Sequence, residues 1–329
     1  MSEVGMRVSV AVPVYNEEAI LPELLRRLRA VLDGVPGGPH EIVIVDDGST
    51  DSTSKILQQE SESDTRLLGV VFSRNFGHQA ALSAALDYVS GDVTMVMDGD
   101  LQDPPEMIPL FIEKYNEGYD VVYAQRVQRK EVWWLRACYY IFYRLIAALS
   151  GTRLPLDAGD FSLISRRVVD QLHRMPEYHR YLRGMRTWIG FCQIGVPVER
   201  ADRQEGETKY SAIKLLKLAS DGIFSFSIVP LRFAAIVGLF AMLLCTLYAL
   251  YALYVRLFLS QVPRGFTALI FAIIFLTGIQ LFFMGVIGEY VGRLYEASKA
   301  RPVYIVSKHF GHPRAGSRSQ SVPASSVGG

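Results

Sequence analysis

The first part of the chain alternates short apolar runs with longer segments in which apolar residues recur at helical spacing. The runs rich in β-branched residues predict buried strands, at 8–13, 41–45, 68–72, 93–97 and 120–124. The amphipathic segments between them predict helices, at 18–33, from 52 onward, at 77–89 and at 107–116. Strands that alternate with helices in this way favour a doubly wound, mostly parallel sheet of the α/β class.

Two uncharged apolar runs follow later in the chain, at 233–255 and 266–288. Each has roughly 23 residues, which is enough to cross the hydrocarbon core of a bilayer as one helix. Only six residues separate Leu259 from Phe266, so we expect the pair to form a transmembrane hairpin. A hairpin buried inside a soluble protein is the alternative, and the basic residues that flank the two runs disfavour it.

Basic residues lie outside the hairpin rather than in its loop. The flanking cations are Lys214, Lys217, Arg232, Arg293, Lys299 and Arg301. The connecting loop has Arg264 alone, with Arg256 at the adjacent helix end. The positive-inside rule then predicts a multi-pass protein of the inner (plasma) membrane with both termini in the cytoplasm. The start of the sequence agrees, because it enters the α/β pattern by Val8 without the features of a signal peptide.

These patterns predict five segments along the chain. A cytoplasmic domain is expected at 1–210, a juxtamembrane amphipathic helix at 211–228 and two transmembrane helices within 229–295, at about 230–257 and 266–290. A cytoplasmic tail segment is expected at 296–310 and a disordered tail, rich in Gly, Ser, Pro and Arg, at 311–329. Aromatic and basic residues mix along 132–149, which suits either an interfacial helix on the membrane or a core helix.

Composition excludes some classes of function. The net charge of the 329 residues is +1, which gives no support for nucleic-acid binding. The three cysteines, Cys138, Cys192 and Cys245, have no paired spacing, so neither a disulfide framework nor a metal knuckle is expected. A reducing compartment is the setting that this cysteine usage favours.

The strongest local signal for chemistry is the triplet Asp98-Gly99-Asp100, directly after the fourth predicted strand. Side chains two residues apart in extended chain project to the same side, so both carboxylates can face one point. That point lies at the carboxyl edge of the sheet, where open α/β sheets bind ligands. Two carboxylates suit Mg²⁺ or Mn²⁺ completed by phosphate oxygens, and Gln102 continues the spacing with a neutral oxygen.

Two further polar loops follow the first and second predicted strands and open on the same edge. They are Pro13-Val14-Tyr15-Asn16-Glu17 and Asp46-Asp47-Gly48-Ser49-Thr50-Asp51. A carboxylate there can accept a hydrogen bond from a base N–H or a ribose hydroxyl, and Tyr15 can lie against a base ring. Ordinary turn and capping chemistry is the alternative for either loop alone. His78 and His173 are isolated along the sequence and are interpreted as structural.

With these motifs the chain resembles the family 2 glycosyltransferases. The resemblance rests on PVYNE, VDDGSTD, DGDLQDPPE and the two C-terminal spans, and it covers about 8–306. More narrowly, the chain is similar to the polyprenyl-phosphate glycosyltransferases, which include dolichyl-phosphate mannose synthases and bacterial undecaprenyl-phosphate glucosyltransferases. The two-span anchor, the DGDLQDPP run and Gly206-Glu207-Thr208-Lys209-Tyr210 resemble the bacterial branch most. The resemblance implies a GT-A-type, Rossmann-like fold with interfacial helices and the C-terminal hairpin.

The resemblance also implies roles for matching residues. It assigns the nucleotide to Pro13, Tyr15, Asn16, Glu17, Asp46 and Asp98. It assigns the metal to Asp98, Asp100 and Gln102, and catalytic roles near the acceptor to Asp157 and Asp160, with Asp100 beside them. It assigns the donor and acceptor phosphates to Arg126, Arg200, Arg203, Lys209 and Tyr210. Thr208 stands where the last motif usually has Ser, and both carry a hydroxyl.

The implied reaction moves a sugar, glucose from UDP by first choice, from a nucleotide-diphosphate sugar to a polyprenyl (undecaprenyl or dolichyl) phosphate at the lipid bilayer. A divalent cation and basic side chains would neutralise the leaving diphosphate. GDP-mannose and UDP-N-acetylglucosamine stay open as donors, as does a homo-oligomer. A processive polysaccharide synthase is one alternative, but the chain lacks the Q-x-x-R-W motif typical of that class. The other is a non-catalytic, membrane-tethered protein that binds nucleotide sugars.

Overall fold

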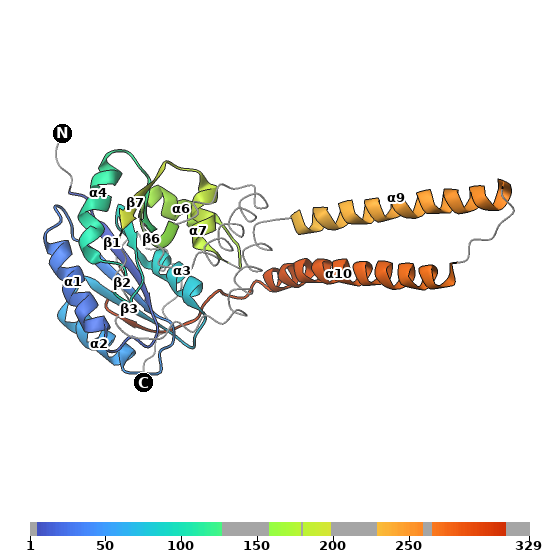
Figure 1. Cartoon of the computed structure of the whole chain (residues 1–329). Helices are drawn as coiled ribbons and strands as arrows, with labels where there is room; N and C mark the ends of the chain where they lie inside the picture. Colours follow the sequence, from blue (N-terminus) through green and yellow to red (C-terminus); the bar gives the residue numbers. More distant parts are fainter. Residues whose placement is uncertain (1–4, 127–157, 179, 199–228, 259–264, 314–329) are drawn as a thin grey trace. The chain divides into compact units, whose positions relative to one another are not determined.

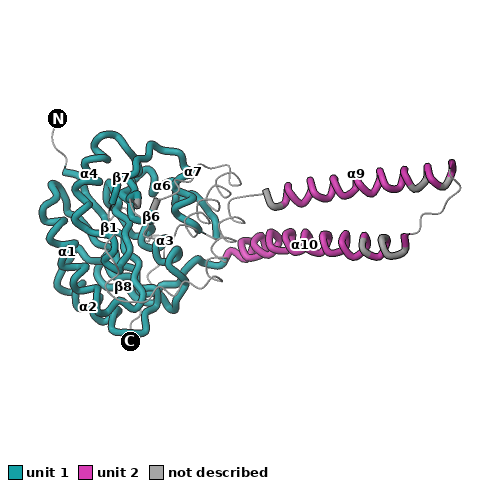
Figure 2. Tube along the Cα trace, in the orientation of Figure 1, with its two compact units in different colours: residues 1–138, 153–209, 301–329 teal, residues 139–152, 210–300 magenta. Residues whose placement is uncertain are grey.

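The computed structural model describes residues 5–126, 158–178, 180–198, 229–258 and 265–313 (Figure 1). The chain divides into two compact units, which are described separately (Figure 2). The first comprises 1–138, 153–209 and 301–329, and the second comprises 139–152 and 210–300. The predicted interfacial helix at 132–149 and the amphipathic helix at 211–228 lie outside the described residues.

An eight-stranded mixed sheet in the order β7-β5-β6-β4-β1-β2-β3-β8 forms the centre of the first unit. Its strands are β1 (Val8–Val14), β2 (Glu41–Asp46), β3 (Leu67–Phe72), β4 (Val93–Val96), β5 (Val121–Arg126), β6 (Ala158–Ser165), β7 (Gln193–Val198) and β8 (Val306–Phe310). β1 pairs in parallel with β2 and β4, β2 with β3, and β5 with β7. β6 lies antiparallel between β4 and β5, and β8 lies antiparallel to β3.

Helices cover both faces of this sheet, which leaves β1 and β2 buried along their whole length. One apolar cluster joins the sheet to α1 (Leu21–Asp33), α2 (Thr53–Ser63) and α4 (Ile108–Asn116), with the 3₁₀ turn η1 (Pro105–Met107) before α4. The other cluster joins it to α3 (His78–Tyr88), α6 (Arg166–Arg174) and α7 (Leu182–Ile189). Two covered faces explain why these strands are continuous apolar runs rather than alternating ones.

The predicted α/β class is confirmed, and the five predicted strands correspond to β1–β5 with small shifts at their ends. The first helix begins at Leu21, later than the predicted 18, and Pro22 occupies its first turn. Asp51 lies just before α2, and its Oδ1 accepts the Thr53 N–H at 3.0 Å. The mixed character of the sheet was not predicted, because β6, β7 and β8 were not recognised as strands.

β8 brings the chain back to the sheet after the hairpin. Just before it, the ring of Tyr304 stacks on Phe72 with centroids 5.0 Å apart, and its hydroxyl donates to Asp87 Oδ2 at 2.8 Å. Within β8, His309 Nε2 lies 2.6 Å from the Tyr88 hydroxyl. The segment 296–310, predicted as a tail, therefore contains a strand of the central sheet.

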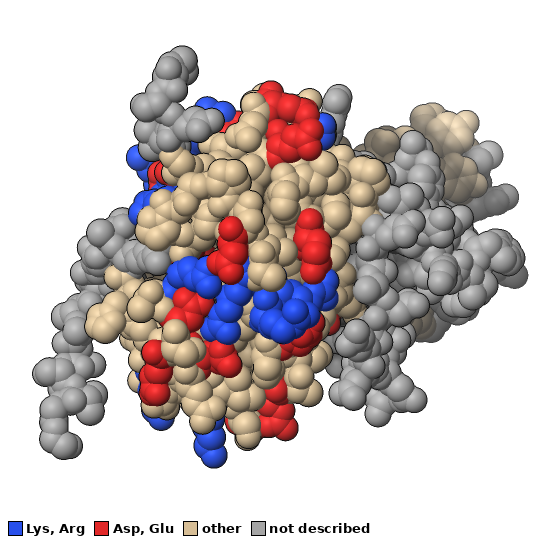
Figure 3. Space-filling model, turned by 90° about the vertical axis from the view of Figure 1, so that its left-hand side faces the viewer, with Lys and Arg blue, Asp and Glu red and all other residues tan. Residues whose placement is uncertain are grey.

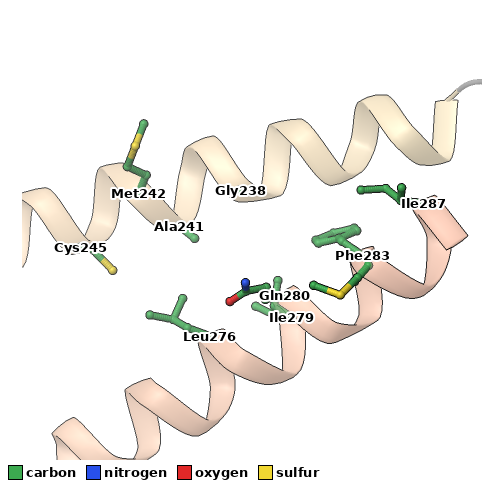
Figure 4. A pocket seen from close by; sticks show the side chains of 10 residues that line it. Gly238, Ala241, Met242, Cys245, Leu276, Ile279, Gln280, Phe283 and Ile287 are labelled. Atoms are coloured by element: carbon green, nitrogen blue, oxygen red, sulfur yellow. The ribbon is translucent and has the colours of Figure 1, made fainter.

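The second unit contains the predicted hairpin as the helices α9 (Val229–Phe258) and α10 (Phe266–Ser298). Their stretches Leu231–Tyr251 and Ala272–Ser298 are long and apolar enough to span a membrane, and none of this surface is buried. Between the helices lies a groove of about 510 Å³, where Ala241 and Cys245 face Leu276 and Phe283 (Figure 4). The amide of Gln280 lies among these apolar side chains.

Charges of both signs mix on the face that carries α1 and α2, where basic side chains lie beside acidic ones (Figure 3). Arg29 of α1 pairs with Glu60 at 2.7 Å and Asp64 at 2.8 Å of the neighbouring segment, and Arg66 pairs with Asp33 at 2.6 Å. Most of these side chains are half-buried, and ion pairs near the surface typically contribute about 1 kcal/mol or less each. The Arg29 pairs join α1 to the end of α2, and the Arg66 pair joins α1 to the start of the segment that follows α2.

We predict that Tyr304→Ala loosens the return of the chain to the sheet. The variant loses the stack on Phe72 and the hydrogen bond to Asp87, which should cost about 2 kcal/mol and lower the unfolding midpoint by roughly 4–8 °C. The measurement is thermal unfolding of the full chain in detergent. Lys308→Ala, on the exposed side of β8, is the control and should leave the midpoint nearly unchanged. Equal midpoints for the two variants would contradict the role given to Tyr304.

Candidate functional site

The candidate site lies at the edge of the sheet where β1, β2 and β4 end. These strands are parallel and in register, with Val14 of β1 opposite Asp46 of β2 and Ala11 opposite Val96 of β4. Their carboxyl ends therefore meet at one edge, where open α/β sheets bind ligands. The three polar loops that the sequence singled out all begin here.

Side-chain to backbone hydrogen bonds join the loops after β1 and β2. Asn16, with a left-handed φ of 54°, accepts the Thr50 N–H on its Oδ1 at 2.8 Å and donates its own N–H to the Ser49 hydroxyl at 2.9 Å. The Glu17 N–H donates to the Thr53 hydroxyl at 3.0 Å. The side chain of Tyr15, between these two residues and β1 in the chain, is 45% exposed. Asn16 and Glu17 thus brace the two loops, and Tyr15 is accessible to a ligand.

Asp46 is the most buried acid at this edge, with a fully buried side chain. Its Oδ1 accepts the N–H and the hydroxyl of Ser49, while its Oδ2 is buried and has no hydrogen-bond partner among the described residues. Burial raises the pKa of this carboxyl, although the Ser49 hydrogen bonds oppose the rise. A buried acceptor without a donor is costly, which marks Asp46 as a site that a ligand N–H or hydroxyl can complete.

The Asp98–Asp100 loop packs tightly against the end of β1. A Cβ on Gly99 would lie 2.7 Å from Val14 Cγ1 and 3.1 Å from the Pro13 carbonyl, so this position accepts only glycine without a shift. Asp100 Oδ1 accepts the Gln102 N–H at 3.1 Å, and Leu101 between them has a left-handed φ of 57°. The side chains at 98 and 100 thus project from a tight turn rather than from extended strand.

The donor set of this loop fits a divalent cation that is completed by its substrate. Carboxylates and an amide oxygen are hard ligands, which Mg²⁺ and Mn²⁺ prefer, and Mg²⁺ usually keeps substrate phosphates among its ligands. Within the described residues no group of three or more acidic, His or Cys side chains forms a closed metal cage. Asp98, Asp100 and Gln102 therefore suit an open site and not an all-protein one.

The loop after β3 adds a histidine that sequence reasoning interpreted as structural. Asp47, which is 3% exposed, accepts the N–H groups of Phe76 at 2.7 Å and Gly77 at 2.9 Å, and so positions the start of α3. From there His78 reaches Asp98, with Nε2 2.9 Å from Oδ1. Burial opposes a charge on the ring, but the hydrogen bond to Asp98 and the charges of Asp160 and Asp47 outweigh it and raise the pKa of His78.

Asp160, the candidate acceptor-side acid, lies near the start of β6 and is held from α7. Arg183 Nε lies 3.4 Å from its Oδ1. One turn further, the buried Arg186 donates to the Ser162 hydroxyl at 2.6 Å and to the Gly159 carbonyl at 3.4 Å. Burial lowers the pKa of Arg186 to about 10, while the charge of Asp160 opposes the shift. Sequence reasoning missed both arginines, although their spacing of three puts them on one helix face.

Several predicted site residues are not part of this picture. Arg126 ends β5, and its side chain lies outside what the structure describes. Asp157, Arg200, Arg203, Lys209 and Tyr210 also lie outside the described residues. The structure thus places Pro13, Asn16, Glu17, Asp46, Asp98 and Asp100 in loops at one edge of the sheet, and the charge of Asp160 contributes to the raised pKa of His78.

The chemistry of this edge follows from its charges. Carboxylates converge on it, and the buried Oδ2 of Asp46 has no hydrogen-bond donor among the described residues. Such an arrangement recognises N–H and hydroxyl groups directly and phosphates through a cation. It is an arrangement that suits a nucleoside diphosphate better than a free anion, which the carboxylates would repel.

Comparison with known proteins agrees with this chemistry. Residues 9–172 match the family described as Glycosyl transferase family 2, and residues 229–294 match the GtrB C-terminal hairpin. The glycosyltransferase YkcC of Bacillus subtilis is 43% identical over 92% of this chain and 94% of its own. A prophage-derived bactoprenol glucosyl transferase of Shigella flexneri is 38% identical over 94% of this chain and 100% of its own.

A bactoprenol glucosyl transferase homolog of Escherichia coli is 37% identical over 92% of this chain and 99% of its own. Among solved structures, glucosyl-3-phosphoglycerate synthase of Mycobacterium tuberculosis is 21% identical and aligns with a TM-score of 0.46, covering 67% of this chain and 81% of that one.

The fold, the acidic edge and these matches define a sugar-transferring enzyme with a GT-A-type domain. The chain belongs to glycosyltransferase family 2, and its C-terminal hairpin makes it a membrane-associated member of that family.

We predict that Asp46→Asn separates binding from stability. A carboxyl whose pKa is raised on folding destabilises the fold above that pKa, and the cost fades as the pH falls through it. The amide removes this charge, so the unfolding midpoint at pH 8 should not fall. UDP affinity should fall about tenfold to a hundredfold, because a charge-assisted hydrogen bond contributes roughly 1.5–3 kcal/mol.

The measurement is UDP titration by calorimetry, beside thermal unfolding at pH 5 and pH 8. Asp33→Asn, at an exposed acid paired with Arg66, is the matched control and should leave UDP affinity unchanged. Wild-type UDP affinity in Asp46→Asn would contradict the prediction that Asp46 contacts the nucleotide.

Proposed function

We propose that this protein transfers glucose from UDP-glucose to a polyprenyl phosphate at the cytoplasmic face of the inner membrane, with inversion at the anomeric carbon. The observation that carries the proposal is the similarity, at 37–38% identity and over nearly the whole chain, to proteins named bactoprenol glucosyl transferase. The similarity includes the hairpin, so it extends to the membrane part as well as to the catalytic fold.

The donor nucleotide would occupy the edge formed by the loops after β1, β2 and β4. The buried Oδ2 of Asp46 would accept the N–H of the uracil ring or a ribose hydroxyl, and the exposed Tyr15 would lie against the base. Pro13, Asn16 and Glu17 would shape this pocket, and Arg126 would meet the diphosphate or the sugar. Asp98, Asp100 and Gln102 would hold Mg²⁺ or Mn²⁺, which neutralises charge on the leaving diphosphate.

The acceptor needs orientation more than deprotonation. A phosphate monoester is already ionised at pH 7, so its oxygen can attack the anomeric carbon as the bond from that carbon to UDP breaks. Asp157 and Asp160 would position the acceptor or a sugar hydroxyl, with Asp160 in turn held by Arg183. Arg200, Arg203, Lys209 and Tyr210 would bind the phosphates, since two phosphate-bearing substrates repel each other without cations between them.

The connectivity supports a membrane topology with both hairpin ends on one side. The chain leaves the first unit before α9, and β8 returns to the same sheet after α10. A folded domain that contains both ends of the hairpin requires an even number of crossings. Together with the basic residues outside the hairpin, this favours a cytoplasmic domain with both termini in the cytoplasm.

Mass spectrometry of the lipid product tests the proposal. The full chain in lipid nanodiscs is given undecaprenyl phosphate and an equimolar panel of UDP-glucose, GDP-mannose and UDP-N-acetylglucosamine. Undecaprenyl-phosphate-glucose is expected as the dominant product. Another lipid-linked sugar as the main product would show that the preferred donor is not UDP-glucose. A polymer would indicate a processive synthase. No product from any donor would indicate a protein that binds nucleotide sugars without catalysis.

The metal assignment predicts that Asp100→Ala abolishes turnover in a folded protein. Losing a cation that stabilises the leaving group by several kcal/mol should slow transfer by more than about a hundredfold. EDTA should stop the wild type, and added Mn²⁺ or Mg²⁺ should restore it. Asp170→Ala, at an exposed acid on α6, is the control and should keep wild-type turnover. Full activity of the wild type in excess chelator would refute the metal role.

The topology predicts opposite labelling of two introduced cysteines. In a variant without Cys138, Cys192 and Cys245, we expect Ser260→Cys in the hairpin loop to react with an impermeant thiol reagent on intact cells. Ser317→Cys in the tail should react only after the cells are opened. Labelling is read by a mass shift on a gel, and the reverse pattern would place the domain outside.

A further inference from the structure

The first turn of α3 lies between the donor-side and acceptor-side acids, although the nucleotide, metal and acceptor assignments leave it without a role. His78 opens this helix directly after Gly77, whose φ of 99° turns the chain into it. Its ring nitrogen Nε2 lies 2.9 Å from Asp98 Oδ1. Asp98 is one of the proposed metal ligands, so a residue that sets the orientation of its carboxylate should affect metal binding.

The position of His78 is set from the neighbouring loop. The carboxylate of Asp47 accepts two successive N–H groups, from Phe76 and Gly77, immediately before the histidine. The loops after β2 and β3 also touch through their backbones, since a Cβ on Gly48 would lie 2.5 Å from the carbonyl carbon of Arg74. These contacts join the start of α3 to the loop that carries Asp46.

The orientation of the His78 ring is set from the other side by Gln79. The Leu182 N–H donates to Gln79 Oε1 at 3.0 Å, so the other arm of this amide is its NH₂ group. That NH₂ lies 3.4 Å from His78 Nδ1. In the neutral ring this contact favours the tautomer in which Nδ1 accepts and the N–H is on Nε2, where it donates to Asp98. The imidazolium also carries a proton on Nε2, so the donation to Asp98 does not depend on titration.

These contacts form a continuous polar chain from Asp98 to the first turn of α7. The chain runs from Asp98 through His78 and Gln79 to the Leu182 N–H, and the next residue, Arg183, lies against Asp160. We propose that His78 is a positioning residue of the donor site. It holds the Asp98 carboxylate in the orientation that binds the metal, and through Gln79 it fixes the position of that carboxylate relative to α7. The inference rests on the proposed function of Asp98.

The expected size of the effect follows from other sites of this kind. Groups that orient a ligating carboxylate typically change metal affinity or activity about tenfold to a hundredfold when removed. His78→Ala should therefore weaken UDP binding in the presence of Mn²⁺ by that factor. His78→Gln should recover most of the loss, because its amide nitrogen places an N–H near the position of Nε2. The side chain of His78 is 46% exposed, so truncation leaves no buried cavity.

The test is a thermodynamic cycle measured by calorimetric titration of UDP with and without Mn²⁺, using the full chain in detergent. The variants are His78→Ala, Asp98→Ala and both together. If His78 acts through Asp98, the double variant binds UDP no more weakly than Asp98→Ala alone. Additive losses would mean that His78 acts independently, and an unchanged affinity in His78→Ala would mean that it has no role. Either result overturns the inference.

His173→Ala supplies the matched control. His173 makes a similar pair, with Nε2 3.3 Å from Asp87 Oδ1 and 3.0 Å from the Leu86 carbonyl, and both of these contacts lie on α3 away from the candidate site. We expect wild-type UDP affinity in this variant, and a loss equal to that of His78→Ala would show general destabilisation and overturn the inference. Failure of the proposed function looks different: the wild type itself would then show no Mn²⁺-dependent gain in UDP affinity.

Discussion

The structure depends on holding several carboxylates together at one edge of a sheet, against their mutual repulsion. Backbone N–H groups do most of this, since Asp46 accepts from Ser49 and Asp47 accepts from Phe76 and Gly77. Side chains complete it, with His78 at Asp98 and Arg183 at Asp160. Each donor removes part of the cost of a buried or crowded negative charge, and together they leave an acidic edge ready for a cation and a nucleotide.

Local pattern was enough to predict β1 to β5 and the helices between them, because each is an apolar run or an amphipathic segment in its own right. Local pattern also predicted that the Asp98–Asp100 triplet lies at the same edge as the other two loops, because parallel strands end at one edge of a sheet. β8 could not be predicted in this way. Val306–Phe310 is short and largely exposed, and it becomes a strand only by pairing with β3, more than two hundred residues earlier. β6 is a similar case, inserted antiparallel between β4 and β5.

The candidate site shows the same division. Carboxylates at strand ends are visible in the sequence, but their partners come from elsewhere in the chain. His78 is isolated along the sequence, but it follows β3 at the same sheet edge as the other loops. That position after a strand could have identified it as a candidate site residue. Arg183 and Arg186 reach β6 only because α7 packs against it, a contact that local periodicity does not encode. The hairpin, by contrast, is plain in the sequence, since length and the absence of charge define it.

If the loops at this edge form the donor site, a bound nucleotide should protect their backbone N–H groups from hydrogen–deuterium exchange. The full chain in nanodiscs is compared with and without UDP and Mn²⁺, and protection is measured along the backbone. We expect slower exchange at 15–18, 46–50, 76–79 and 98–102, with no change on α1 and α2. Protection confined to other segments, with these four unchanged under saturating UDP, would contradict it.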